Sequence, residues 1–247
     1  MLKSHYRDIA QNQDKLWWHL GMKAINKSLL DTYLSKNLAE KNLKILDAGC
    51  GPGAMLPMLA SYGDVIGVDI SDEALKYAQM RGKVKKGNIL DLDFADETFD
   101  LVVCMDVLYH TWVEDEAKAL REFNRVLKKG GILLVREPAY NWLRGREDVG
   151  SLAKRRFSKM ELANLLQKSS FKILKITYAN FFLFPIVFIL RIRSSLSPNN
   201  IKGSSDLTIP APVINIVLFK LLKFEGWLMK FFSLPFGSSL ICIARKV

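Results

Sequence analysis

Apolar runs alternate with amphipathic stretches along the first half of this chain. The apolar runs predict five strands, at residues 43–47, 65–69, 84–88, 99–106 and 132–138. The stretches 71–82 and 114–131 predict helices, because each begins with acidic residues and ends with basic residues and glycine. This alternation predicts an α/β fold in which a parallel sheet carries helices on both faces and binds its ligand at the carboxyl ends of the strands.

The second half of the chain departs from this alternation. Residues 171–179 alternate in polarity and predict a sixth strand, and residues 238–247 predict a final strand. The 58 residues at 180–237 lie between them. If the sixth strand runs parallel to the first five and the last strand runs back, this insertion emerges beside the ligand site. We therefore expect it to roof the site.

The insertion contains the most apolar stretch of the chain, NFFLFPIVFILRIR at 180–193, which ends at Arg191 and Arg193. A helix over FFLFPIVFIL would be about 15 Å long, against a hydrocarbon core of ~30 Å, and Pro185 interrupts it. The pattern therefore argues against a transmembrane helix. A polar loop is expected at 197–206.

Residues 213–234 predict a basic amphipathic helix. On a helical wheel the quarter that carries Asn215, Lys223, Gly226 and Lys230 is polar. The broad opposite face is apolar and carries Val217, Leu221, Phe224, Leu228 and Phe231. A helix of this kind lies in a membrane interface. The alternative is that its apolar face packs on the sheet or on a second copy of the chain.

The charge of the chain is unevenly distributed. Residues 1–135 hold 18 Lys and Arg against 19 Asp and Glu, whereas residues 136–247 hold 18 against 6. Basic and strongly apolar sequence together favour an anionic membrane surface over nucleic acid. The three cysteines form no CxxC pair and the three histidines have no metal-ligand spacing, so no metal site is predicted. The polar first residues predict no secretory leader, and we expect a cytoplasmic protein.

The sequence ILDAGCGPG at 45–53 predicts a ligand-binding loop. Its glycines have GxGxG spacing and allow a ligand to approach the backbone closely. Asp47, which precedes them, disfavours a pyrophosphate and favours a ligand with positive charge. Asp69 ends the second strand, where it can accept hydrogen bonds from the hydroxyls of a ribose. A ribose with a cationic tail fits S-adenosylmethionine better than NAD.

The motifs DAGCGPG, VDIS at 68–71 and GNILDLDFADETFDLVV at 87–103 resemble those of the class I S-adenosylmethionine-dependent methyltransferases. VLYH at 107–110 and REFNRVLKKGGILLV at 121–135 also match. The resemblance implies a Rossmann-like sheet of seven strands. It also implies that the cofactor contacts Asp47, Gly49, Cys50, Gly51, Gly53, Asp69, Ile70, Asn88, Ile89 and Met105. This family often has Asp at the position of Asn88.

These patterns divide the chain into four parts. Residues 1–37 form an N-terminal helical cap and residues 38–179 form the cofactor-binding core. Residues 180–237 form the helical insertion between strands six and seven, and residues 238–247 complete the core.

The expected chemistry is an in-line displacement of the sulfonium methyl group, which leaves S-adenosyl-L-homocysteine. If the acceptor is a hydroxyl, a base helps, and His110 after the fourth strand is the first candidate. Its alternative role is to cap the loop structurally. Tyr109 and Tyr140 are weaker catalytic candidates.

Acceptor binding is expected from side chains that surround the strand ends. These are Trp17 and Trp18 before the core, Arg155 and Arg156 in a basic run, and Phe184 in the insertion. Each has a structural alternative, namely packing for the aromatic residues and solvation for the arginines.

The leading hypothesis is a methyltransferase of a lipophilic acceptor, such as a quinone, an isoprenoid or a lipid-linked compound, that is peripheral on the inner face of the membrane. A polar acceptor or RNA, with a structural or dimerising insertion, is the alternative. A third hypothesis is a cofactor-binding membrane adaptor without catalysis. The sequence leaves open whether the chain is a monomer or a homodimer.

Overall fold

A single sheet of seven strands organises the molecule, which was obtained as a computed structural model that describes residues 3–34, 42–189 and 209–247. The strands are β1 (Leu43–Ala48), β2 (Gly63–Asp69), β3 (Lys83–Lys86), β4 (Phe99–Met105), β5 (Leu127–Pro138), β6 (Phe171–Ala179) and β7 (Ser239–Lys246). They lie in the order β3-β2-β1-β4-β5-β7-β6, and β7 is antiparallel to both of its neighbours. The predicted seven-stranded α/β fold is confirmed.

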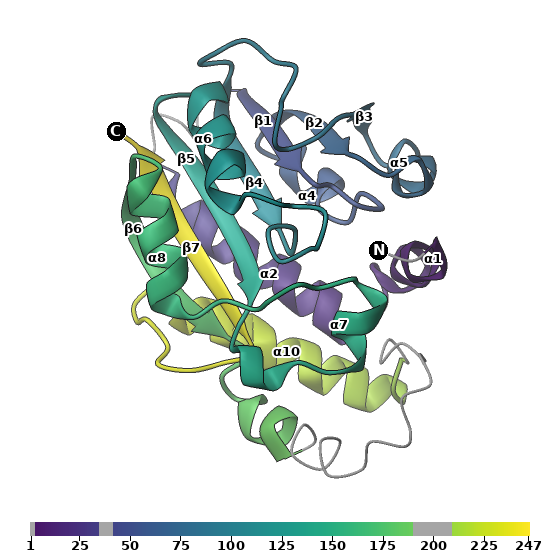
Figure 1. Cartoon of the computed structure of the whole chain (residues 1–247). Helices are drawn as coiled ribbons and strands as arrows, with labels where there is room; N and C mark the ends of the chain where they lie inside the picture. The colour runs from purple at the N-terminus through teal and green to yellow at the C-terminus, as the bar shows by residue number, and fades with distance from the viewer. Residues whose placement is uncertain (1–2, 35–41, 190–208) are drawn as a thin grey trace.

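Helices cover both faces of this sheet (Figure 1). One face packs against α6 (Glu116–Val126) and α8 (Lys159–Lys168), and the other packs against α2 (Trp17–Tyr33) and α10 (Pro212–Leu228). The remaining helices are α1 (Lys3–Asn12), α4 (Leu56–Leu59), α5 (Asp72–Ala78), η1 (Asn141–Leu143) and α7 (Arg146–Gly150). The apolar runs of the central strands are therefore buried on both sides.

The helix before the fifth strand ends earlier than the sequence pattern predicts. α6 stops at Val126, and β5 begins at Leu127, which pairs with Phe99 across an irregular register. Gly130 has a φ of 75°, which suits glycine and turns the chain within this strand. The prediction of helix through residue 131 was wrong, because strand pairing at Leu127 competes with helix propensity.

The position of the insertion agrees with the argument from strand direction. β6 is parallel to the first five strands, so residue 180 leaves the sheet at the carboxyl ends. A short helical stretch follows at 184–189. The expected loop at 197–206, Arg191, Arg193 and the predicted boundary near residue 37 lie outside the described residues.

The contacts of α10 divide its residues differently from the polar and apolar faces of the helical wheel. Gly226, counted as polar, packs against Ile25 of α2, and Asn215 accepts a hydrogen bond from the Trp17 backbone N–H at 2.9 Å. The side chains of Val217, Phe224 and Phe231 are 58%, 48% and 62% exposed. These three side chains do not pack on the sheet, whereas Leu221 of the same predicted face packs against the core.

The reason is that α2 and α10 approach closely through small residues. A Cβ atom added to Gly226 would lie 3.0 Å from the Ile25 Cα atom. Beside this contact, the buried carboxylate of Glu225 accepts the Asn180 backbone N–H at 2.6 Å. These contacts fix which face of α10 is turned inward. Within the described part of the chain, no helix is both long enough and apolar enough to span a bilayer.

Gly21→Ala should destabilise the fold, because the new Cβ atom would lie 2.3 Å from Leu222 Cδ1. The cost of overpacking, about 1–3 kcal/mol, should exceed the gain of up to ~1 kcal/mol in helix propensity. Urea denaturation measures the change in the free energy of unfolding. The exposed Thr32→Ala in the same helix is the control and should shift it by less than about 0.5 kcal/mol. A Gly21→Ala protein as stable as the parent would contradict this packing.

Candidate active site

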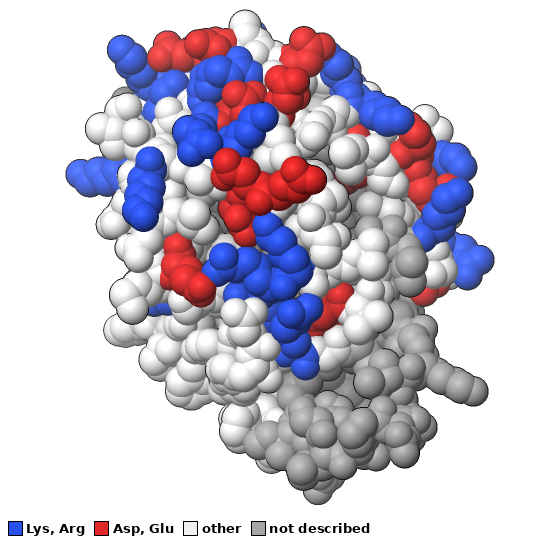
Figure 2. Space-filling view, in the orientation of Figure 1, with Lys and Arg blue, Asp and Glu red and all other residues white. Residues whose placement is uncertain are grey.

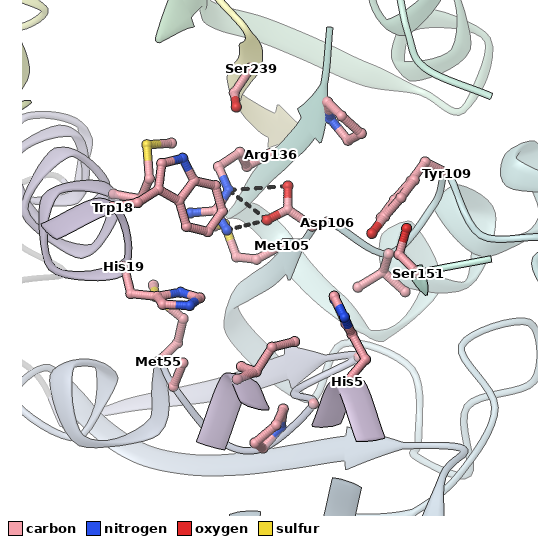
Figure 3. A pocket seen from close by; sticks show the side chains of 18 of the residues that line it. His5, Trp18, His19, Met55, Met105, Asp106, Tyr109, Arg136, Ser151 and Ser239 are labelled. Carbon is pink, nitrogen blue, oxygen red and sulfur yellow. Dashed lines mark hydrogen bonds and ion pairs between the residues drawn. The ribbon is translucent and has the colours of Figure 1, made fainter. Parts of the chain in front are cut away.

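A cavity of about 450 Å³ lies at the carboxyl ends of the strands (Figure 3). Side chains of α1 and α2 close it on one side, and the segment after β6 closes it on another. The predicted residues that line it are Asp47, Gly49, Cys50, Gly51, Asp69, Met105, Tyr109, His110, Trp17, Trp18 and Arg156. The cavity thus lies where the strand-end argument predicts the ligand site, and chain segments far apart in sequence meet there.

The glycine loop presents bare backbone to the cavity. Gly49 and Gly51 both have positive φ, of 81° and 52°. A Cβ atom on Gly51 would meet nothing within 4 Å, so the space beside it is open to a ligand. A Cβ atom on Gly49 would instead lie 2.4 Å from Val107, so this glycine is required by close packing. Gly53 does not line the cavity; its carbonyl accepts a hydrogen bond from Arg81 at 3.0 Å.

Two carboxylates stand beside this loop. Asp69 accepts the backbone N–H groups of Gly51 and Ser71, at 2.9 and 2.8 Å. Asp47 Oδ2 is buried and has no hydrogen-bond partner among the described residues. Burial, and next the charge of Asp69, raises the pKa of Asp47 to about 7. Burial also raises the pKa of Asp69. A buried acceptor without a partner is costly, so the site favours a ligand that brings a donor or a cation.

The donor set therefore fits S-adenosylmethionine. Asp47 could hold its positively charged amino-acid part. Asp69 still has free lone pairs for ribose hydroxyls, since each of its oxygens has one backbone donor. The open backbone at Gly51 leaves room between them. These residue roles remain predictions that rest on this fit.

Two of the predicted cofactor contacts, Asn88 and Ile89, lie outside the cavity lining. Asn88 Oδ1 accepts the backbone N–H of Leu90 at 2.9 Å, and the Ile89 side chain is buried in the core. Ile70 is exposed and does not line the cavity either. The backbone of Ile89 and the remaining hydrogen-bonding groups of the Asn88 side chain are still free to contact the cofactor. These contacts stay predictions.

The N-terminal segment covers the cofactor loop through side chains that the sequence pattern did not single out. Tyr6 of α1 is buried beside Asp69, and its pKa is raised to about 12, first by burial and then by that charge. Asp14 accepts hydrogen bonds from Arg81 at 2.6 and 2.9 Å and from Lys23 at 2.8 Å. Because Arg81 also binds the Gly53 carbonyl, this cluster joins the N-terminal segment to the loop. No sequence motif in α1 predicts this contact with the cofactor loop. It follows only from where α1 lies in the fold.

An ion pair lies on the α2 side of the cavity. Arg136, at the end of β5, binds Asp106, and its guanidinium carbon lies 5.3 Å from the centroid of the Trp18 ring. His19 lines the same region, as Figure 3 shows. Burial, and then the charge of Arg136, lowers the pKa of His19 to about 4, so its ring is neutral at neutral pH. Arg136 follows the strand-end rule and could have been predicted from it, whereas His19 could not.

Tyr109 and His110 belong to a loop whose backbone is fixed by hydrogen bonds to Glu137. This fully buried carboxylate accepts the backbone N–H groups of Val107, Leu108 and Tyr109 at 2.9–3.2 Å. Burial lowers the pKa of His110 to about 4, and its Nδ1 atom finds no partner in the part of the chain that the structure describes. Burial raises the pKa of Tyr109, which therefore stays protonated. His110 is therefore neutral at neutral pH and lines the cavity.

Three of the predicted residues lie beside the cavity rather than in it. Tyr140 stacks on Tyr178 and Trp142, and Phe184 joins this aromatic cluster at 6.0 Å from Tyr140. Leu183 and Val187, the neighbours of Phe184, line the cavity in its place. Arg155 binds Glu161 and lies over Phe157. The structure thus offers packing or pairing roles for these three residues.

Arg156 lines the cavity, but its charge is already paired. It binds Asp148 in a bidentate geometry at 2.8 and 2.9 Å, and both side chains are buried. This arrangement does not favour binding of an anionic acceptor by Arg156, because the anion would have to displace a buried carboxylate. Among the described residues, no group of three or more His, Cys, Asp or Glu could hold a metal ion.

Residues 46–135 match the family model of the methyltransferase domain. A probable S-adenosylmethionine-dependent methyltransferase of Mycolicibacterium smegmatis is 30% identical over 135 residues, or 52% of this chain and 52% of that protein. The ubiquinone biosynthesis O-methyltransferase of Coxiella burnetii is 27% identical over 140 residues, or 52% of this chain and 57% of that protein. The chain thus spans about half the length of these relatives.

The fold as a whole is similar to that of a methyltransferase of Haloferax volcanii, solved in complex with the Trm112 methyltransferase activator. The TM-score is 0.63 at 18% identity, and the similarity covers 98% of this chain and 95% of that one. Residues 46–135 therefore match the methyltransferase domain, as the motifs predicted, and the solved methyltransferase shares the fold of the whole described chain.

Cofactor affinity should rise with pH through the titration of Asp47. Its pKa of about 7 means that the carboxylate becomes ionised between about pH 6 and 8, and only the ionised form attracts a cation. We expect calorimetric affinity for S-adenosylmethionine to increase up to roughly tenfold per pH unit below 7. In Asp47→Asn this dependence should be lost, and the difference between the two profiles removes the titration of the cofactor itself. Parallel profiles would contradict a contact with Asp47.

Asp69→Ala should weaken S-adenosylmethionine binding by about 10- to 100-fold, the usual effect of losing hydrogen bonds to a charged group. Asp69→Asn keeps one acceptor and should lose less. The control is Asp72→Ala, since Asp72 is exposed in the next turn and pairs only with Lys86. Unchanged affinity in Asp69→Ala, measured by equilibrium dialysis, would contradict the assignment of this site.

Proposed function

We propose that this chain transfers the methyl group of S-adenosylmethionine to a lipophilic acceptor, such as a quinone, an isoprenoid or a lipid-linked compound. The observation that carries the proposal is the apolar wall of the cavity beyond the glycine loop. Its side chains are Leu16, Trp17, Trp18, Met22, Met55, Met105, Leu183 and Val187. Walls of this kind bury most of the surface of an apolar ligand, with a few polar groups to orient it.

Polar groups within this wall could orient the reacting end of the acceptor. The Arg136–Asp106 pair and Ser239 face the cavity from β5, β4 and β7 (Figure 3). They would suit a head group that bears oxygen atoms, such as a quinol ring. The likeness to the ubiquinone O-methyltransferase of Coxiella burnetii supports this class of acceptor.

Methyl transfer requires that donor and acceptor are held in line and apart from water. When bound, S-adenosylmethionine supplies an electrophilic methyl group and a good leaving group. Asp47 and Asp69 would hold the donor, and side chains of α1 and α2 would exclude water. If the acceptor is a hydroxyl, its proton passes to a neutral base, and His110, which lines the cavity and is neutral at neutral pH, is the candidate for this role.

The proposal includes a cytoplasmic chain that is peripheral on the inner face of the membrane, where such acceptors reside. A polar metabolite or RNA as acceptor, and a cofactor-binding adaptor without catalysis, are the competing functions. In the same experiment the first predicts a different labelled product, and the second predicts no labelled product.

Incubation with methyl-labelled S-adenosylmethionine and a total lipid extract should move label into the organic phase, where mass analysis identifies the product. Asp69→Ala should reduce the labelled lipid in proportion to its loss of cofactor affinity. Label confined to water-soluble metabolites or RNA would overturn the lipophilic acceptor. Cofactor binding without turnover on lipid, metabolite or RNA fractions would instead favour the adaptor.

A further inference from the structure

The outward side of α10 exposes a row of apolar residues, here termed the outer face. It consists of Val213, Ile216, Val217, Phe224, Trp227 and Phe231, all of which are exposed. Phe224 and Trp227 stack at 5.7 Å, and Trp227 meets Phe231 at 5.4 Å. The inner side of the helix, with Leu222, Gly226 and Met229, already packs on α2 and the sheet. α10 is therefore apolar on both sides, whereas a helix on a water-facing surface is polar on its outer side.

The charges beside the outer face have one sign. Lys220 is exposed within the outer face, one helical turn from Ile216 and Phe224. Lys223 is exposed at its edge, and Lys230 is partly exposed in the turn that follows. The only acid in residues 209–247 is Glu225, which is fully buried under the Asn180 backbone. An apolar row with lysines within it and beside it, and with no exposed acid among residues 209–247, complements an apolar partner with negative charge. A bilayer that contains anionic lipid has this chemistry.

A second copy of the chain fits this face less well. In a two-fold contact the same surface meets itself, so the lysines of one copy would approach those of the other. No carboxylate of α10 is available to pair with them, because Glu225 is turned inward. The rings of Phe224, Trp227 and Phe231 also suit the boundary between headgroups and acyl chains, where aromatic side chains are enriched.

The outer face is continuous with the cavity wall. Phe182 lies 6.1 Å from Phe224, and the helical stretch 184–189 follows directly. Val187 of this stretch lines the cavity, while Ile186 and Phe188 are exposed on its other sides. One helical turn thus separates the cavity from the same apolar surface. In Figure 2, charged side chains gather on the upper part of the molecule, and the lower left, over the loop between α10 and β7, carries few.

We propose that the outer face of α10 docks on an anionic membrane surface and holds the cavity mouth at the lipid. The delivery of acceptor rests on the function proposed above, but the docking does not. Docking can therefore be measured without cofactor or acceptor, and it can fail or succeed independently of methyl transfer.

The test is sedimentation of the full chain with vesicles of phosphatidylcholine, alone or mixed with phosphatidylglycerol, at moderate salt. We expect binding to the mixed vesicles and clearly weaker binding to the neutral ones. The double variant Phe224→Ser and Phe231→Ser should bind at least about tenfold more weakly, since it removes two apolar anchors. Lys220→Gln with Lys223→Gln should reduce the preference for anionic vesicles.

The matched control is Met80→Ser with Met160→Ser, which removes two exposed apolar side chains far from α10 in sequence. It should bind vesicles as the parent does. Thermal unfolding and cofactor affinity of all the variants should match the parent, which shows that the fold is intact. A parent protein that stays in the supernatant with anionic vesicles, or a Phe224→Ser, Phe231→Ser variant that still sediments fully, would overturn the proposal. So would a dimer in vesicle-free buffer that this variant dissociates.

Discussion

The burial of Asp47 beside Asp69 is the constraint on which the site depends. The two carboxylates end neighbouring strands, β1 and β2, so parallel pairing brings them to one edge of the sheet. Backbone donors satisfy Asp69 in part, but Asp47 Oδ2 has no partner in the described chain. Burying a charge without a partner costs several kcal/mol, or else the group takes up a proton. A cationic ligand relieves this cost. The site and a positively charged cofactor therefore complement each other.

Contacts around the cavity fix the chain segments that shield Asp47 and Asp69 from solvent. Glu137 gathers three backbone N–H groups and so fixes the loop of Tyr109 and His110 over the strand ends. Asp14 and Arg81 connect the N-terminal segment to the glycine loop. The low pKa values of His19 and His110 have the same origin, since burial disfavours the charged ring. Desolvation thus favours the uncharged forms of both the acids and the bases in a single cavity.

A second constraint acts on the other side of the molecule. Gly21 and Gly226 allow α2 and α10 to touch, and the buried Glu225 anchors the chain as it leaves β6. With its inner side committed to α2, α10 must present its remaining side chains to the outside. The helical wheel grouped Val217, Phe224 and Phe231 on one face, but it placed Gly226 and Asn215 on the polar face although both contact α2. Glycine and asparagine count as polar on a wheel, although both can serve as contact residues between helices.

Local pattern determined much of this protein. Apolar runs, the helix-start acids, the GxGxG loop and the acids at positions 47 and 69 were enough to predict the α/β sheet, its strand-end site and its cofactor class, because these features are encoded over a few consecutive residues. The tertiary structure alone decided which distant side chains meet there. It brought Tyr6, His19 and Arg136 to the cavity, paired Arg156 with Asp148, and moved Tyr140 and Phe184 into an aromatic cluster. Such contacts depend on how helices pack across the sheet, and no short stretch of sequence carries that information.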